Sequence, residues 1–393
     1  MKVLCLTPWF PSHRQDQNGN FIFASVEALA DLGHEVTVLV TTPWRPKAAG
    51  VLSKDWVKKK IHVEQFSEKL NLHACSYLSI PRSYFYSFTH WQYRKFVNPL
   101  LEKLIRRHGC QLIHAHTELA GVSAVDVGQK LGVPSVLTLH GISTEPKLYV
   151  GNTRKILFEY AMAKTSRVVL VGNPLLNFAK QFVSNSDHFR IVSNGFRTCA
   201  HNAVNNKKHW PTKQLRFISV SNLQESKGID INLRALAKLN SMGIVDWEYK
   251  IIGDGREKNR LGLLIKELNL SQQVDFLGAC DQDEVYKQLT KADVFILPSY
   301  LEAFGIAYLE AMSCGLLTVG IEGQGSQAFI EHGKTGFLAQ PKNIDSLVDI
   351  LRVIFQYPEK SGFIAESGKN HVHQNFTWHS HATNLIKIYE ELV

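Results

Sequence analysis

The sequence predicts an α/β protein made of two doubly wound domains, each a parallel sheet covered by helices. Short apolar, β-prone runs alternate with helical segments from the start of the chain, a polar stretch at 204–214 interrupts the alternation, and the pattern then restarts. A chain of 393 residues that is 45% hydrophobic and 20% charged also has enough apolar material for two cores of ordinary size.

The first half of the chain predicts one domain, residues 1–203. Strands are expected at 2–7, 35–40, 112–115, 135–139, 167–171 and 190–192. Helices are expected at 21–32 and 119–131, and each is followed by a glycine, Gly33 or Gly132, at the position that favours a helix C-terminus. Because helices separate consecutive strands, the strands should run parallel.

The second half predicts a second domain, residues 215–378, after a polar linker at 204–214. Strands are expected at 215–220, 249–252, 273–277, 294–297 and 317–320, with helices at 231–239 and 283–290. Ligands of such sheets bind at the carboxyl ends of the strands. We therefore expect a site in a cleft between the domains. Five candidate residues lie at or just after the carboxyl ends of the expected strands: Gly19, His140, Lys227, Gly253 and Glu302.

The segment 299–315 is the most informative part of the chain. It follows a buried apolar strand, and its helix should begin near Gly305 and end before Gly315. A helix N-terminus that opens on a glycine offers unpaired N–H groups and a positive dipole, which suit a phosphate.

Two carboxylates, Glu302 and Glu310, frame this helix start. Eight residues of helix rise about 12 Å, more than the roughly 5–9.5 Å between the paired carboxylates of a glycosidase, so a hydrolytic dyad is disfavoured. The two acids can instead accept hydrogen bonds from hydroxyls at the two ends of a sugar nucleotide, Glu302 from the sugar and Glu310 from the ribose. The alternative is a loop acid and a charge on a helix surface.

The cysteine content and the charge distribution indicate in which compartment the protein works and which kinds of partner it has. The six cysteines are scattered without a C-x-x-C pair, which is typical of a reduced, cytoplasmic protein. No leader-like start and no apolar run of about 18 residues is seen, so we expect a soluble or peripheral chain. Residues 1–200 hold 24 Lys and Arg against 13 Asp and Glu, a net +11, whereas the remainder holds 20 against 22, a net −2.

The basic first half indicates an anionic partner. Nucleic acid is not expected, because no zinc finger or RNP-like aromatic motif is present. An anionic membrane surface at the inner face of the membrane, or a phosphate-linked acceptor, is the better explanation, and an ordinary solvated surface is the alternative. The amphipathic basic stretch 91–107, with Trp56 and lysines 58–60 upstream, either lies on such a membrane or packs on the first sheet. Tyr84, Phe85 and Tyr86 either stack on an acceptor sugar or belong to the core.

Several motifs, in order over nearly the whole chain, resemble one family. Glu302 and Glu310 resemble the E-x7-E motif of the retaining glycosyltransferases of family 4, of the bacterial cell-surface polysaccharide type. Further similar segments are the opening strand with Gly19, Thr138 to Gly141 (T-x-H-G), Val192 to Gly195 (P-N-G), Ser226 to Gly228 (K-G), Ile252 to Gly255 (G-D-G) and the closing helix with Phe376 to Trp378.

The resemblance implies the GT-B fold, two Rossmann-like domains facing a central cleft, with a last helix (379–393) that packs back on the first domain. It implies catalytic roles for His140, Glu302 and Lys227. It also implies that the donor is bound by Gly19, Asn222, Gly253, Phe304, Gly305, Ile306 and Glu310. The family usually has an arginine where Asn222 stands, so the diphosphate pocket should lack one positive charge. From its place at a strand end alone, His140 can equally be a core or capping histidine.

The expected function is transfer of a hexosyl unit from a UDP- or GDP-sugar to a hydroxyl of a glycan or lipid-linked glycan, with retention, in cell-surface polysaccharide or glycolipid synthesis. No cofactor or metal is expected: the histidine pairs 114/116, 371/373 and 379/381 lack the ligand spacing of a zinc site, and no D-x-D motif ends a strand. The alternatives are a sugar-nucleotide epimerase of the same fold and a non-catalytic sugar-nucleotide binding subunit.

Overall fold

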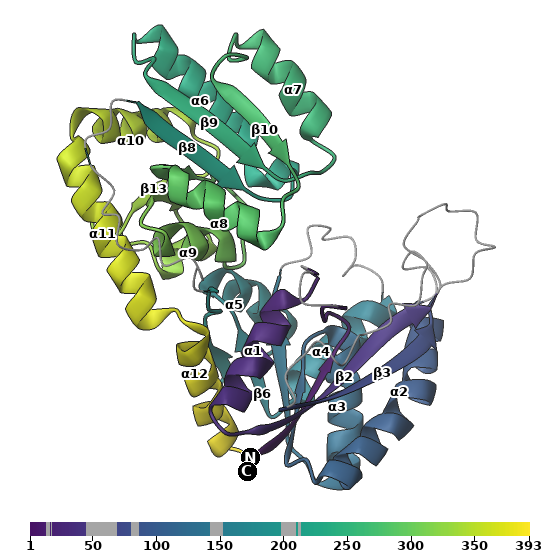
Figure 1. Cartoon of the computed structure of the whole chain (residues 1–393). Coiled ribbons are helices and arrows are strands. Elements are labelled where there is room, and N and C mark those ends of the chain that lie inside the picture. Colours follow the sequence, from purple (N-terminus) through teal and green to yellow (C-terminus); the bar gives the residue numbers. More distant parts are fainter. Residues whose placement is uncertain are drawn as a thin grey trace. The chain divides into compact units, whose positions relative to one another are not determined.

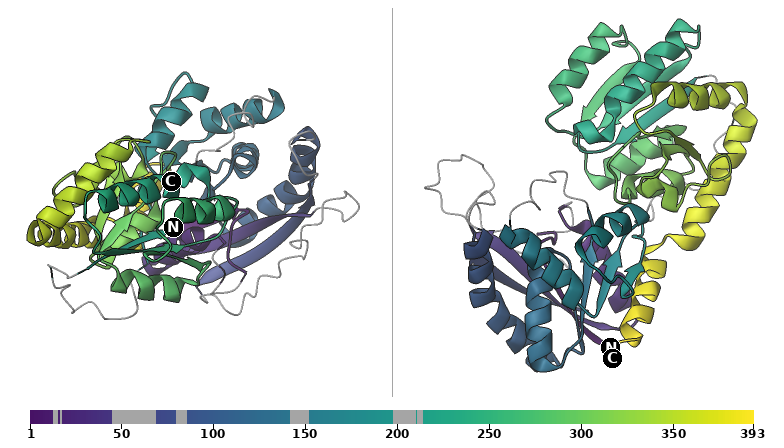
Figure 2. Two further views of the ribbon diagram at one scale, coloured as in Figure 1. Left: turned by 90° about the horizontal axis from the view of Figure 1, so that it is seen from above. Right: turned by 180° about the vertical axis from the view of Figure 1, so that it is seen from behind.

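The computed structural model of this chain describes residues 1–12, 16, 18–44, 69–79, 86–141, 152–197, 210 and 214–393. It has two compact units, each built on one parallel sheet with helices on both faces (Figure 1, Figure 2). Unit 1 comprises Met1–Asn194 and Trp378–Val393, and unit 2 comprises Gly195–Thr377. The linker predicted at 204–214 lies outside the described residues apart from Trp210 and Gln214.

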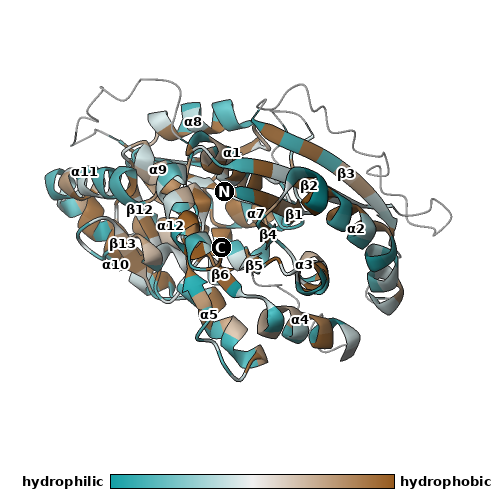
Figure 3. Ribbon diagram, turned by 90° about the horizontal axis from the view of Figure 1, so that it is seen from below, coloured by the Kyte–Doolittle hydropathy of each residue, from teal (hydrophilic) through white to brown (hydrophobic). Residues whose placement is uncertain are grey.

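In the described part of the chain, the sheet of unit 1 has seven parallel strands in the order β3-β2-β1-β4-β5-β6-β7. They are β1 (Lys2–Thr7), β2 (Glu35–Trp44), β3 (Leu70–Leu78), β4 (Leu112–Ala115), β5 (Ser135–Leu139), β6 (Arg167–Leu170) and β7 (Phe189–Ile191). Strand β7 begins one residue before its predicted start. Strand β3 was not predicted, because on this edge strand polar residues interrupt the apolar ones (Figure 3).

The helices of unit 1 are α1 (Asn20–Asp31), α2 (Tyr86–His108), α3 (Glu118–Leu131), α4 (Asn152–Lys164), α5 (Asn173–Ala179) and α12 (Trp378–Glu390), with a short 3₁₀ turn at Lys180–Phe182. The predicted glycines follow α1 and α3 with positive φ, 87° at Gly33 and 69° at Gly132. Helix α3 also has an N-cap, since the Thr117 hydroxyl accepts a hydrogen bond from the Ala120 N–H at 3.4 Å.

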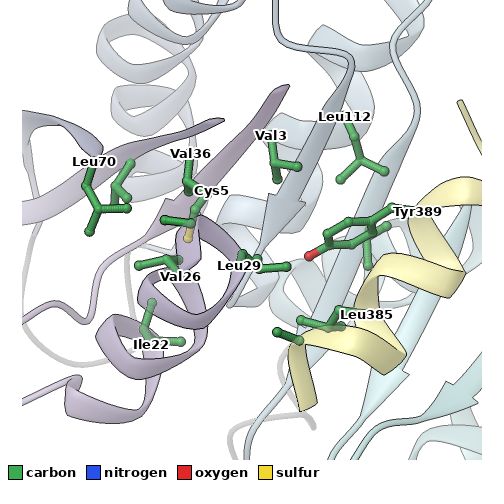
Figure 4. Packing of buried hydrophobic residues seen from close by; sticks show 14 of the residues in the cluster. Val3, Cys5, Ile22, Val26, Leu29, Val36, Leu70, Leu112, Leu385 and Tyr389 are labelled. Atoms are coloured by element: carbon green, nitrogen blue, oxygen red, sulfur yellow. The ribbon is translucent and has the colours of Figure 1, made fainter. Parts of the chain in front are cut away.

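One buried cluster in unit 1 joins the two ends of the chain. Leu385 and Tyr389 of α12 point toward Leu29 of α1 and toward the first strands of the sheet (Figure 4). Each of these side chains is at most 1% exposed, and burying one such side chain contributes about 1.5–3 kcal/mol. The last helix therefore belongs to the core of the unit that β1 begins.

Among the described residues, the sheet of unit 2 has six parallel strands in the order β10-β9-β8-β11-β12-β13. They are β8 (Leu215–Val220), β9 (Trp247–Ile252), β10 (Val274–Gly278), β11 (Val294–Ile296), β12 (Leu317–Ile321) and β13 (Phe337–Ala339). The predicted strand at 273–277 is shifted by one residue, and β13, a strand of three residues, was not predicted.

The helices of unit 2 are α6 (Ile229–Ser241), α7 (Lys258–Glu267), α8 (Gln282–Lys291), α9 (Ile306–Ser313), α10 (Ile344–Gln356) and α11 (Pro358–Asn375), with 3₁₀ turns at Glu225–Lys227 and Gly325–Ala328. In both sheets the strand order reverses direction next to the first strand of the unit. These switch points lie between β1 and β4 in unit 1 and between β8 and β11 in unit 2, and ligands bind at the carboxyl ends of strands there. In the described ranges, no helix is both long enough and apolar enough to span a bilayer.

Candidate functional site

The loop between β11 and α9 lies at the switch point of unit 2. Helix α9 begins at Ile306 and ends at Ser313, close to the predicted bounds, and Gly305 caps it with a φ of 92°. A Cβ on Gly305 would lie 2.6 Å from the Tyr308 ring, so no other residue fits there without movement. The first N–H groups of α9 have no partner within the helix and point along its positive end.

Lys227 and Glu302 form an ion pair beside this helix start. Lys227 Nζ lies 2.7 Å from Glu302 Oε2, and the two side chains are 21% and 14% exposed. The backbone of Glu302 is held as well, because its N–H donates to Gln324 Oε1 at 3.0 Å and its carbonyl accepts from the Gly325 N–H at 3.0 Å. The sequence assigned these two side chains to different parts of a donor, and the structure brings them together.

Three glycines let the loops around the pair pack backbone to backbone. A Cβ at Gly253 would lie 1.8 Å from the Ser221 carbonyl oxygen, and one at Gly255 would lie 2.4 Å from that of Leu223. A Cβ at Gly228 would lie 2.5 Å from the Pro298 carbonyl oxygen. The loops after β8, β9 and β11 therefore form one continuous surface, and a side chain at any of the three glycine positions would push the loops apart.

Glu310 is the fifth residue of α9, about one turn from the start of the helix. Burial raises the pKa of its carboxyl to about 7, and a hydrogen bond from Gln282 Nε2 at 2.6 Å partly offsets that rise. Gln282 is the first residue of α8, and nothing in its local sequence indicated a role in the site. Because its carboxyl is buried and hydrogen-bonded, Glu310 is not the exposed helix-surface charge of the alternative interpretation.

The other residues of unit 2 that were predicted to bind the sugar-nucleotide donor differ in which of their groups can contact a ligand. Asn222 is exposed in the loop after β8. Phe304 is 2% exposed and packs against Phe329 with ring centroids 5.4 Å apart, so only its backbone is placed to meet a ligand. Ile306 is the first residue of α9 and contributes its N–H to the helix start.

In unit 1, His140 follows β5 and contacts two aromatic rings and a second histidine. Its Nε2 lies 2.9 Å from His116 Nδ1, and its ring centroid lies 4.8 Å from that of Phe21 and 6.4 Å from that of Trp9. Burial, together with the nearby His381, lowers the pKa of His140 to about 3. The imidazole is therefore neutral at pH 7, so one ring nitrogen donates a hydrogen bond and the other accepts one.

Gly19 caps α1 near these rings. Its φ is 80°, and a Cβ there would lie 2.5 Å from the Trp9 carbonyl carbon and 2.6 Å from the Phe10 nitrogen. Because Gly19 has no side chain, the segment after β1 can approach the first turn of α1 closely. The expected contact of Gly19 with the donor stays a prediction.

Two further histidines of unit 1, His114 and His381, hydrogen-bond to protein groups through both ring nitrogens. His114 is bonded through Nε2 to Thr138 Oγ1 and through Nδ1 to the Tyr389 hydroxyl, each at 2.6 Å. His381 is bonded to Ser25 Oγ at 2.9 Å and to the Ser193 carbonyl at 2.8 Å. Over the described ranges, His, Cys, Asp and Glu form no group of three or more with the arrangement of a metal site.

The basic stretch 91–107 lies on α2, whose buried side packs on β3 and β2. Trp91 and Phe96 remain 52% and 47% exposed, and Lys95 Nζ lies 5.0 Å from the centroid of the Trp91 ring. Trp56, lysines 58–60, Tyr84 and Phe85 lie outside the described residues, and Tyr86 is the first residue of α2.

Two family descriptions match the chain and together span most of it. The description Glycosyltransferase Family 4 matches residues 19–198, and Glycosyl transferases group 1 matches residues 202–371. An uncharacterized glycosyltransferase of Methanocaldococcus jannaschii is 26% identical over 74% of this chain and 78% of its own length. The N-acetyl-alpha-D-glucosaminyl L-malate synthase of Bacillus anthracis is 25% identical over 75% of this chain and 81% of its own length.

Solved structures of similar architecture cover the whole chain. Sucrose-phosphate synthase of Thermosynechococcus elongatus superposes with a TM-score of 0.76 at 19% identity, over 100% of this chain and 99% of that one. Anabaena HepE, solved in complex with UDP-glucose, superposes with a TM-score of 0.72 at 19% identity over 100% of both chains. These similarities establish the fold, and with the two family matches they identify the protein: the chain belongs to the family 4-like glycosyltransferases of the GT-B fold.

Proposed function

We propose that this glycosyltransferase moves a hexosyl unit from a nucleoside diphosphate sugar to a hydroxyl of a glycan or lipid-linked glycan, with retention at the anomeric carbon. The observation that carries the proposal is the Lys227–Glu302 pair beside the N-terminus of α9 at the switch point of unit 2. A cation, a helix N-terminus and a carboxylate at one place suit a diphosphate joined to a sugar.

Each of these groups has a role in the proposal. The Lys227 ammonium and the N–H groups of α9 stabilise the charge that develops on the diphosphate as it leaves. Glu302 accepts hydrogen bonds from hydroxyls of the donor sugar, and Glu310 accepts them from the ribose. Asn222 donates one hydrogen bond where the family usually has a charge, and His140 exchanges one with a sugar hydroxyl.

The proposed reaction needs no enzyme nucleophile. The bond between the anomeric carbon and the phosphate oxygen breaks, and the acceptor oxygen forms its new bond on the same face of the sugar. The proton of the acceptor hydroxyl passes to an oxygen of the departing phosphate. The side chains orient the two substrates and stabilise the leaving group, and no metal is assigned a part.

The comparisons support a nucleotide-sugar donor. Anabaena HepE was solved with UDP and glucose and with UDP-glucose, which favours a UDP-sugar among the UDP- and GDP-sugars. The epimerase and the non-catalytic subunit are not favoured, since both halves of the chain match glycosyltransferase families. A role in cell-surface polysaccharide or glycolipid synthesis belongs to the proposal as well.

A panel of UDP- and GDP-sugars, each incubated with the protein and a mixture of oligosaccharide and polyprenyl-linked acceptors, tests the proposal. Release of the nucleotide with formation of an extended glycan is the expected result. An isomerised donor would indicate an epimerase, and binding without any product would indicate a binding subunit.

A further inference from the structure

A buried polar cluster joins α6 to the strands that lead into the proposed donor site of unit 2. It consists of Ser219 on β8, Asn232 on α6 and Tyr249 on β9, and each of these side chains is 0% exposed. The amide nitrogen of Asn232 lies 3.3 Å from Ser219 Oγ and 2.9 Å from Tyr249 Oη, and the two hydroxyl oxygens are 2.7 Å apart. The same amide donates to the Ile296 carbonyl of β11 at 3.2 Å.

The cluster lies where the pairing between β8 and β11 ends. The last paired residues are Ile218 and Phe295, and the next residues in register are Ser219 and Ile296. There the Ile296 carbonyl accepts hydrogen bonds from two side chains, the Ser219 hydroxyl and the Asn232 amide. Side chains therefore hold the two strands together at the switch point, where backbone pairing stops and ligands bind.

Each of these strands leads to one member of the Lys227–Glu302 pair. Strand β8 continues through a loop to the 3₁₀ turn that ends at Lys227, and α6 begins two residues later. Strand β11 continues through the loop that contains Glu302. Close to the pair, the Ser226 carbonyl accepts from the Tyr300 N–H at 3.0 Å and from Ser299 Oγ at 3.3 Å. The position of Lys227 relative to Glu302 therefore depends on how α6, β8 and β11 are joined.

Packing alone does not explain an asparagine at position 232. Within α6, all of which the structure describes, the other buried residues are apolar: Ile229, Ile231, Leu233, Ala235, Leu236 and Leu239. Among the described residues, Asn232 Oδ1 has no hydrogen-bond partner, and a buried acceptor without a partner costs free energy. Without the amide, the Tyr249 hydroxyl can still donate to Ser219, and Ser219 to the Ile296 carbonyl. What the asparagine adds is a direct link from α6 to β11.

We propose that Asn232 is a positioning residue for the transfer: by bonding α6 to the carboxyl end of β11, it fixes Lys227 at the distance from Glu302 that a diphosphate joined to a sugar requires. This rests on the proposed function. Asn232 is fully buried, so it acts through the elements that it joins. A displacement of about 1 Å in a group that stabilises the reaction can lower the rate about 100-fold.

Replacing the asparagine by leucine tests the proposal. We expect Asn232→Leu to lower kcat with the preferred donor about tenfold or more, because Lys227 is no longer held in place. In Lys227→Ala, which has no lysine left to position, the same substitution should change kcat by less than about twofold. A substitution that only weakened the fold would lower kcat by the same factor in both backgrounds. Asn232→Ala is measured in the same way if the leucine variant does not fold.

Asn240→Leu is the matched control. Asn240 lies on the same helix, and its side chain bonds to Gln273 Oε1 at 2.7 Å and to the Trp247 indole N–H at 2.9 Å, at the amino ends of β9 and β10. Its replacement should lower the urea midpoint of unfolding but leave kcat within about twofold of the wild type. The inference is overturned if the control lowers kcat as much as Asn232→Leu, if Asn232→Leu leaves kcat unchanged, or if its full effect persists without Lys227.

Hydrogen exchange separates a failure of this inference from a failure of the proposed function. The amides of Tyr300 and Glu302 are hydrogen-bonded in the loops of the site, and that of Leu215 is hydrogen-bonded at the amino end of β8. Asn232→Leu should speed exchange at the first two about tenfold relative to Leu215, and Asn240→Leu should not. If no donor is transferred, the proposed function fails, and this exchange ratio alone decides whether Asn232 holds the two loops. An unchanged ratio would overturn the inference.

Discussion

Lys227 and Glu302 satisfy each other's charge in a partly enclosed place. Removing either leaves the other without its partner, and an uncompensated, poorly solvated charge is costly. For Lys227 a diphosphate offers a replacement anion. For Glu302 a sugar hydroxyl offers a hydrogen-bond donor. In the proposed complex the pair would therefore couple the contact to the diphosphate with the contact to the sugar, which the sequence treated as separate.

Replacing Glu302 should separate turnover from nucleotide binding. We expect Glu302→Ala to lower kcat about 100-fold or more, since a contact to the reacting sugar is lost. The product nucleotide should bind equally well or more tightly, because Lys227 no longer pairs with a carboxylate. Steady-state kinetics and calorimetry with the nucleoside diphosphate measure the two effects. Glu331→Ala, a change at an exposed acid of unit 2 that pairs with Lys334, serves as the control, and unchanged turnover in Glu302→Ala would refute the assignment.

Glu310 predicts a pH dependence of donor binding. Its pKa is raised to about 7, so the carboxyl gains its charge as the pH rises through 7, and only the carboxylate accepts hydrogen bonds at both oxygens from the ribose diol. We expect UDP-glucose, whose diphosphate has no proton to lose in this range, to bind more tightly at pH 8 than at pH 6. Calorimetry at both values should show the change in the wild type and lose it in Glu310→Gln. An equal pH dependence in that variant would contradict the ribose assignment.

At the scale of elements, the loops of unit 2 depend on glycine. The loops after β8 and β9 are joined by hydrogen bonds from Ser221 N–H to the Ile252 carbonyl and from Leu223 N–H to the Asp254 carbonyl, both 3.0 Å. Gly253 holds a φ of 136° between them. The surface that presents Lys227 therefore exists only while the backbones can approach this closely.

Gly253→Ala should separate these loops. The new methyl group would lie 1.8 Å from the Ser221 carbonyl oxygen in a conformation that L-residues rarely adopt, so unit 2 should lose about 3 kcal/mol or more of unfolding free energy. In Gly262→Ala, where the methyl group meets nothing within 4 Å inside α7, the unfolding free energy should instead rise by about 0.5–1 kcal/mol. Hydrogen exchange of the β8 and β9 amides compares the two variants, and equal protection in both would contradict this account.

The sequence predicted the elements whose residues alone determine them. Buried parallel strands are continuous apolar runs, so β1, β4, β5 and β8 were predicted with their observed bounds. Strand β3 alternates polar with apolar residues and was missed. In the site, Gly305 and the start of α9 followed from local backbone requirements. The contacts of Gln282 with Glu310 and of Gln324 with Glu302 join residues 28 and 22 positions apart and depend on tertiary packing.

At the scale of the whole molecule, the net positive charge lies in the first half, residues 1–200. Lys95, Lys103 and Arg106 are exposed on α2 and share one face with Trp91 by helical spacing. An exposed tryptophan among basic residues is a combination found at anionic membrane surfaces. The cytoplasmic face of a membrane, where a lipid-linked acceptor would be met, is consistent with this distribution.

Sedimentation of the full chain with vesicles examines that surface. We expect binding to rise with the fraction of anionic lipid and to fall at high salt. Changing Lys95, Lys103 and Arg106 together to Gln should weaken binding about 100-fold, since each basic residue contributes about 1 kcal/mol. The same change at Lys287, Lys291 and Lys334 of unit 2 is the control. Indifference of the wild type to anionic lipid would leave α2 as a solvated surface and favour a soluble acceptor.

The most direct test of the central claim is the anomeric configuration of the product, followed by proton NMR during the reaction. With the preferred α-linked nucleoside diphosphate sugar and an accepted glycan, the account predicts an α-linked product at the first observable time point, together with one nucleoside diphosphate per bond formed. Glu302→Ala should give the same product more slowly. A β-linked first product, or a changed donor sugar without any transfer, would contradict retention and the proposed function.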